Sequence, residues 1–277
     1  MGGRQGLAAL VVAGFAVFST YARADELTVA DAARPSVATF ETSTRARFSW
    51  TEIAFRGDRP KAWDEITSPE FRASLRILAG LFEAKLEIGA IADRFARFET
   101  VDTNSLRGEL QLGVNTGGWS YLLEWKPRDV FREGFANFVA GFETYDLRLR
   151  RRFTAAVFGD TPPGLIQASF ATGYTASTPS LFKRNFAEFE FEMVQGFGNG
   201  VALTIAPKLE LSDYPAFTGP ERREDAQFSL RLIPSYNFAG GVALSLEGQA
   251  TIAFSTRDTK TGETWSLTPI LRLQKAL

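Results

Sequence analysis

The chain has 277 residues, with 31 basic and 32 acidic side chains, a formal charge of −1, and neither cysteine nor histidine. The lack of cysteine excludes disulfides, and the lack of histidine removes the commonest general base and metal ligand. A charge balance this close to neutral gives no reason to expect a nucleic-acid partner.

Residues 1–24 have the features of a cleaved secretory signal peptide. Arg4 supplies a positive start, Leu7–Phe18 is apolar without interruption, and Ala22-Arg23-Ala24 fits the cleavage site. An uncleaved anchor is the alternative, but the apolar run is shorter than the roughly 20 residues that a spanning helix needs. Residues 25–38 show no strand pattern, and we expect them to form a periplasmic leader.

From about residue 43 onward, polar and apolar side chains alternate with a period of two, which is typical of β-strands with two unlike faces. The first strand is predicted over residues 43–55 and is followed by a polar loop over residues 57–65. The phase of the alternation changes within residues 71–94, which predicts two strands joined by a two-residue turn at Phe82-Glu83.

Residues 106–114 and 119–126 are predicted strands on either side of a turn at residues 115–118. Residues 127–142 leave two interpretations open. They form either a short helix in a loop or the first half of a long strand with a bulge near Glu143. The phenylalanines whose spacing suggests the helix are Phe131, Phe135, Phe138 and Phe142.

The rest of the chain continues the hairpin rhythm to its C-terminal strand. The remaining strands are predicted over residues 146–153, 166–174, both arms of the hairpin 184–211, 227–237, 242–252 and 265–274. The total is twelve if residues 134–158 hold a single strand. Three prolines fall on apolar strand positions where a ladder hydrogen bond is lost, so bulges or other pairing irregularities are expected at Pro207, Pro234 and Pro269.

This pattern resembles bacterial outer-membrane β-barrels of the porin-like class over the whole predicted mature chain. The resemblance implies an all-β fold: a closed antiparallel transmembrane barrel of twelve strands over residues 39–277, with short periplasmic turns and longer extracellular loops. It also implies a Gram-negative outer membrane as the location, with membrane lipid and the barrel-assembly machinery as partners.

A soluble lipocalin-like barrel or a sandwich, with the apolar face inside, is the alternative fold. Twelve strands enclose a lumen wider than that of the eight-stranded barrels that side chains can fill, which argues against an apolar interior. Aromatic residues near strand ends suit the girdles of a membrane barrel. They are Trp119, Trp125, Tyr174, Tyr236, Phe254 and Trp265.

The charged residues of the polar faces are the candidate pore lining. They are Arg45, Arg47, Arg72, Arg76, Arg148, Arg150, Arg152, Glu188, Glu190, Glu192, Lys208, Glu210, Arg231 and Arg272. In one interpretation, arginines on the first, second and last strands face the three glutamates across the lumen and create a transverse field. In the other, the arginines at 148–152 reach over a strand of small residues, pair with the glutamates and plug the lumen.

Two functional hypotheses follow, and neither is enzymatic. Without histidine, no catalytic residue, metal site or cofactor is expected. The first hypothesis is a channel that passes small polar or charged solutes by diffusion through a lumen lined by arginine and glutamate. The second is a non-conducting barrel that serves as anchor or accessory of an envelope assembly, such as polysaccharide export.

Overall fold

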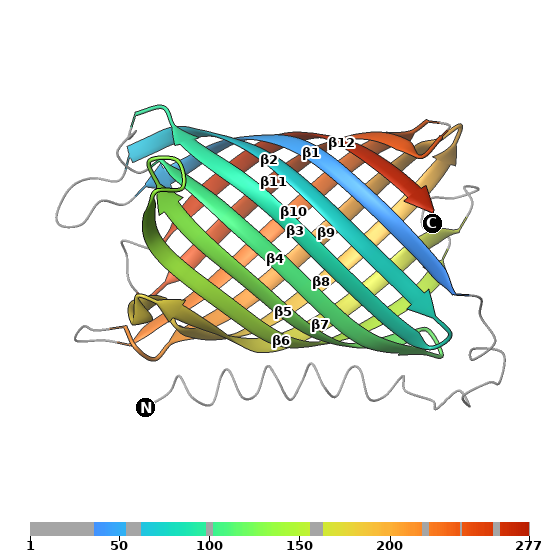
Figure 1. Cartoon of the computed structure of the whole chain (residues 1–277), viewed down its shortest axis with the longest axis horizontal. Helices are drawn as coiled ribbons and strands as arrows, with labels where there is room; N and C mark the ends of the chain where they lie inside the picture. Colours follow the sequence, from blue (N-terminus) through green and yellow to red (C-terminus); the bar gives the residue numbers. More distant parts are fainter. Residues whose placement is uncertain are drawn as a thin grey trace.

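The structure is a computed structural model that describes residues 36–53, 62–97, 102–155, 163–217, 222–238, 240–256 and 261–276. The predicted signal peptide and residues 25–35 of the predicted leader lie outside these ranges. The described residues form a closed antiparallel barrel of twelve strands (Figure 1), which confirms the predicted fold class. Each strand pairs with its neighbours in sequence, and β12 closes the barrel against β1.

The strands are β1 (Val37–Ile53), β2 (Ala62–Ala79), β3 (Phe82–Phe95), β4 (Thr103–Thr116), β5 (Trp119–Arg132), β6 (Asn137–Ala155), β7 (Gly164–Thr178), β8 (Arg184–Gly198), β9 (Val201–Tyr214), β10 (Arg223–Asn237), β11 (Val242–Ser255) and β12 (Gly262–Ala276). A short 3-10 turn, η2 (Ser180–Phe182), lies between β7 and β8. Within the described ranges, no helix is long and apolar enough to cross a membrane.

The two faces of the barrel wall differ in chemistry. Large apolar side chains such as Phe71, Leu86 and Leu123 are exposed on the outside, whereas Glu124 and Asp146 are buried on the inside. Water would disfavour this arrangement, but lipid favours it, because the wall presents hydrocarbon and the closed ladder satisfies the backbone polar groups. The alternative of a soluble barrel with an apolar interior is therefore wrong.

Aromatic side chains form rows on the outer face. Trp125 pairs with Tyr145, which pairs in turn with Tyr174 on the next strand, and Trp50 pairs with Trp265. All five are exposed. Rows of Trp and Tyr are typical of the lipid–water interface, where the ring is in lipid and the polar atom reaches water.

The N-terminal end of β1 and the C-terminal end of β12 lie at the same end of the barrel, on the right in Figure 1. Two-residue turns at this end are Gly80-Leu81, Gly117-Gly118 and Asn199-Gly200, whereas the β6–β7 connection over residues 156–163 is longer. Asn199 and Gly200 take φ of 49° and 81°, as a tight turn that follows the strand twist requires. Short turns assign this end to the periplasm.

The turn predicted at Phe82-Glu83 is wrong by two residues. The turn is Gly80-Leu81, and Gly80 takes a φ of 58°, which costs glycine little. β3 therefore begins at Phe82, which is exposed on the outside, and Glu83 is buried on the inside. Most strands are also longer than predicted; β1, for example, begins at Val37, inside the predicted leader, and β2 begins at Ala62, inside the predicted loop.

Residues 127–142 form the extracellular ends of β5 and β6 and the turn between them, so of the two interpretations left open the helix is wrong. The pairing shifts register at Val130/Phe131, so the bulge does not lie near Glu143 as the strand interpretation expected. The ring of Phe131 packs edge-on against those of Phe135 and Phe138, with centroids 5.7 and 5.9 Å away. This cluster accounts for the spacing of these three phenylalanines, whereas Phe142 packs against Phe182 of η2.

The strand prolines interrupt the pairing on one side without changing its register. No pair joins β8 to β9 at Pro207, β10 to β11 at Pro234, or β12 to β1 at Pro269, and the register resumes unchanged beyond each gap. Proline has no N–H to donate, so one rung of the ladder is lost and no residue is inserted. These positions are pairing gaps and not bulges.

Candidate functional site: the charged lumen

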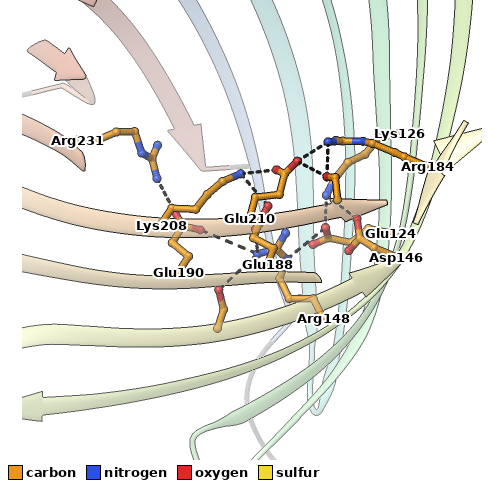
Figure 2. Close-up of polar contacts among 12 residues, drawn as sticks. Glu124, Lys126, Asp146, Arg148, Arg184, Glu188, Glu190, Lys208, Glu210 and Arg231 are labelled. Atoms are coloured by element: carbon orange, nitrogen blue, oxygen red, sulfur yellow. Dashed lines mark hydrogen bonds and ion pairs between the residues drawn. The ribbon is translucent and has the colours of Figure 1, made fainter. Parts of the chain in front are cut away.

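The largest group of charges inside the barrel, which we call the central network, joins strands β5, β6, β8, β9 and β10 (Figure 2). Its members are Glu124, Lys126, Asp146, Arg148, Arg184, Glu188, Glu190, Lys208, Glu210 and Arg231. It contains five acids and five bases, so its formal charge is zero. Each member lies within ion-pair distance of an opposite charge.

Arg148 on β6 holds the two halves of this network together. Its Nη1 atom lies 2.9 Å from Glu188 Oε1 on β8, and its Nε atom lies 3.4 Å from Glu124 Oε2 on β5. To reach Glu188 the side chain crosses β7 at Ala171, which pairs in register with both residues and is 0% exposed. A larger side chain at 171 would fill the path. This contact agrees with the ion-pairing interpretation of the sequence.

A second crossing of the same kind joins β10 to β8. Arg231 pairs with Glu190 over Ala206 of β9, which is also 0% exposed. Lys208 Nζ on β9 lies 2.7 Å from Glu188 Oε2 on β8 and 3.3 Å from Glu210 Oε2 on β9. Lys208 therefore links β8 to β9 through these two acids. Small inward residues thus mark the places where arginine crosses a strand.

Six further charges form a second balanced group on β2, β3 and β4, which we call the β2–β4 cluster. Its members are Glu70, Arg72, Lys85, Glu87, Arg107 and Glu109. Lys85 Nζ lies 3.0 Å from Glu87 and 3.2 Å from Glu109. Arg107 crosses β3 to reach Glu70 at Gly89, where an added Cβ would lie 3.1 Å from Arg107 Nε.

Toward the periplasmic end, a cavity of about 420 Å³ is bordered by strands from opposite sides of the barrel. We call it the periplasmic cavity. Apart from members of the β2–β4 cluster, its charged lining is Arg45, Arg76, Arg150, Arg152, Arg272, Glu41 and Glu83.

The contacts in the periplasmic cavity leave its arginines with few acidic partners. Arg76 Nη2 and Arg150 Nη2 share Glu83, at 2.8 and 3.3 Å. Arg152 Nε donates to the neutral Gln167 at 2.9 Å.

Toward the other end, a cavity of about 520 Å³ is bordered by Arg128, Phe142, Phe182, Tyr214 and Arg223, together with members of both balanced groups. We call it the extracellular cavity. The guanidinium of Arg223 lies 3.9 Å from the ring centroid of Tyr214 and pairs with Asp225. Arg72 and Glu87 border both cavities, so this part of the β2–β4 cluster lies between the two.

The predicted pore-lining residues fall into two groups, those that form an ion pair inside the barrel and those that form none with a described residue. Glu188 and Glu190 are neutralised in the central network, whereas Glu192 forms no ion pair with any described residue. Arg272 pairs with Glu41 at 3.1 Å. Arg47 also has no ionic partner in the described part of the chain, and its Nε atom is buried without a hydrogen bond.

Several central charges were absent from the predicted lining. Glu83, Glu124, Lys126, Asp146 and Arg184 all pair inside the barrel. The alternation of their strands was the signal that could have found them, except for Glu83, which the misplaced turn removed from β3. In the ranges that the structure describes, no three metal-ligating side chains come together.

No family model matches the chain, and no curated protein matches it. An outer membrane channel from Pseudomonas putida F1 has a similar structure, with a TM-score of 0.58 and 13% identity over 90% of this chain and 99% of that one. LpxR from Salmonella typhimurium gives 0.48 and 10%, over 86% and 99% of the two chains. The translocator domain of the autotransporter NalP from Neisseria meningitidis gives 0.44 and 11%, over 95% and 97%.

At identities this low, the similarity shows the fold alone. The shared fold, the apolar exterior and the charged interior together identify the chain as a β-barrel of the bacterial outer membrane. Its activity has to be argued from the lumen.

Proposed function

We propose that this barrel is a passive channel through which small polar or charged solutes diffuse. The observation that supports the proposal is the pair of cavities, about 420 and 520 Å³, which lie along the lumen and share Arg72 and Glu87 in their walls. Both are bordered mainly by charged and polar side chains. A barrel of this size without a solute path would be expected to fill its interior more completely.

The lining that we propose comprises the fourteen candidate residues and the central charges paired with them. Ionised side chains in a narrow lumen replace part of the hydration shell of a passing ion and so lower its entry cost. Because both balanced groups are neutral, they contribute hydrogen bonds to polar solutes without strongly favouring one sign of charge. The candidates that form no ion pair with a described residue are left to bias that selectivity: Arg45, Arg47, Arg152 and Glu192.

One observation favours the second candidate, a non-conducting barrel that anchors or assists an envelope assembly. Arg150 on β6 reaches Glu83 on β3 by crossing β4 at Gly113 and β5 at Ser120. A bridge that skips two strands cuts a chord through the lumen and narrows it. The two candidates differ in a single measurable quantity, the flux of solute.

Liposome swelling measures that flux directly. We expect vesicles that contain the refolded mature chain to swell in small uncharged sugars and to swell more slowly as the sugar grows. Ser74→Trp places a large ring in the periplasmic cavity, which Ser74 borders, and should slow swelling. The matched control is Ala73→Trp, because Ala73 belongs to the outward, apolar face of the same strand. Vesicles that never swell, with folded protein inserted, would favour the anchor.

A further inference from the structure

Among the described residues outside the two balanced groups, positive charge exceeds negative charge most in the periplasmic cavity. The central network holds five acids and five bases, and the β2–β4 cluster holds three of each. Once the members of these groups are set aside, the lining of the periplasmic cavity keeps five arginines and two glutamates, a difference of 5 − 2 = +3. These residues are Arg45, Arg76, Arg150, Arg152, Arg272, Glu41 and Glu83.

The arginines of this cavity have donors that no described protein group accepts. Arg45 forms no ion pair with any described residue, and its Nε atom, like that of Arg150, is buried without a hydrogen-bond partner. Among the described residues, Arg152 donates only to the neutral amide of Gln167. Each guanidinium offers five N–H donors, more than the few described acceptors of this cavity can satisfy.

Carboxylates that do not line the periplasmic cavity also interact with its arginines. Glu70 and Glu247 interact electrostatically with Arg45, and Glu192 with Arg150 and Arg152. Glu70 is already paired with Arg72 and Arg107 in the β2–β4 cluster. These acids moderate the positive potential but do not occupy the space that the guanidinium groups face.

We propose that the periplasmic cavity is a binding site for a small multivalent oxyanion, a solute that carries a phosphate or two carboxylates. Guanidinium groups bind such oxygens through paired, charge-assisted hydrogen bonds, and an excess of three positive charges matches a di- or trianion better than a monoanion. The volume of about 420 Å³ lies within the range of small-molecule sites. This inference names the solute class of the proposed channel and rests on that function only for the entry of the solute.

The extracellular cavity provides the contrast within the same barrel. Outside the two balanced groups, its arginines are Arg223, which pairs with Asp225, and Arg128, which donates to Ser105 Oγ at 3.1 Å. Counted over the lining alone, as for the periplasmic cavity, its excess is two positive charges, because Asp225 is not part of the lining. The excess grows from the extracellular cavity to the periplasmic one, so an anion that crosses the barrel is held most strongly near the periplasm.

Binding is tested without any membrane flux, by isothermal titration calorimetry of inorganic phosphate into the refolded mature chain. The protein is held in a non-ionic, phosphate-free detergent, with chloride keeping the ionic strength constant. We expect saturable binding of one phosphate per barrel. Arg45→Gln and Arg152→Gln should each weaken it about tenfold or more, because each removes charge-assisted hydrogen bonds. Arg128→Gln, the matched control in the other cavity, should leave the affinity unchanged.

Each outcome decides the inference independently of the channel. Circular dichroism and heat-dependent gel migration show which variants are folded, and Arg272→Gln replaces any that is not. No saturable phosphate binding, or equal weakening by Arg128→Gln, would overturn the anion site even if vesicles swell. Binding that depends on Arg45 and Arg152, in a barrel that never conducts, would keep the site and reject the channel.

Discussion

Replacing Arg148 with methionine should destabilise the barrel by leaving buried carboxylates with one cation fewer. The side chains of Arg148, Glu188 and Glu124 are 13%, 10% and 6% exposed, so water compensates little for the lost charge. Methionine keeps an unbranched apolar stem in place of the arginine stem beside Ala171 and lacks only the guanidinium end. The change therefore removes the charge and its hydrogen bonds while largely preserving the packing.

The magnitude follows from what remains in the network. Removing one partner of a buried pair costs about 3–5 kcal/mol when the other charge is left alone. Glu188 keeps Lys208 at 2.7 Å, and Glu124 keeps Lys126, so we expect the lower end, about 3 kcal/mol. The matched control is Arg152→Met, on the same face of β6. It loses one hydrogen bond to a neutral amide and relieves repulsion among arginines, so its cost should stay within about 1 kcal/mol.

Urea unfolding of the barrel in lipid vesicles, followed by tryptophan fluorescence, gives both free energies by linear extrapolation. A double-mutant cycle of Arg148→Met with Glu188→Gln should give a coupling energy of about 1–3 kcal/mol. The reasoning is refuted if Arg148→Met costs no more than Arg152→Met, or if the cycle shows no coupling.

The remaining predictions use the same unfolding assay. Ala206→Leu should block the path of Arg231 to Glu190 and cost about 1–3 kcal/mol, whereas Ala250→Leu on the lipid face should change stability by at most about 0.5 kcal/mol; equal costs would contradict the crossing. Gly173→Ala should destabilise, since its Cβ would lie 2.2 Å from the Tyr145 carbonyl oxygen, while Gly196→Ala meets nothing within 4 Å and should be tolerated. Leu246→Arg, in the middle of the exposed face of β11, should lower the free energy of unfolding by about 2–4 kcal/mol, and Gln249→Arg on the inward face should lower it much less. The reverse order would mean that the lipid-facing and lumen-facing sides of β11 are assigned the wrong way round.

The alternation of the sequence was sufficient to predict the strands and their two faces. Glu188 and Phe189 occupy opposite sides of one strand whatever its neighbours are, because side chains alternate with a period of two. The same property explains the misplaced turn. Moving a two-residue turn from Phe82-Glu83 to Gly80-Leu81 changes no side chain's face, so alternation cannot locate the turn to better than two residues. The positive φ of Gly80 decides it.

The contacts between charges were less predictable, because they depend on the register of several strands at once. Arg150 pairs with Glu83 only because β3 to β6 place Gly113 and Ser120 between them. The expectation that arginines on β6 reach the glutamates of β8 was correct for Arg148, since Ala171 leaves room. It was wrong for Arg150 and Arg152, whose partners are Glu83 and Gln167.

The phenylalanines of residues 127–142 show how a local cluster can imitate another structure. Phe131, Phe135 and Phe138 meet at the tip of the β5–β6 hairpin, where the turn and a bulge bring them together. Their spacing of four and three residues is that of a helix face. Tertiary pairing with β4 and β7 overrides that local preference.

Single-channel conductance of the refolded mature chain in a planar bilayer tests the proposed channel most directly. The measurement compares the native lumen with a variant in which Glu188, Glu190 and Glu192 are changed to glutamine. We expect stable conductance in the native protein and a shift of ion selectivity toward anions in the variant, because three negative charges leave a lumen that keeps its arginines. A folded, inserted barrel that passes no current would contradict the channel.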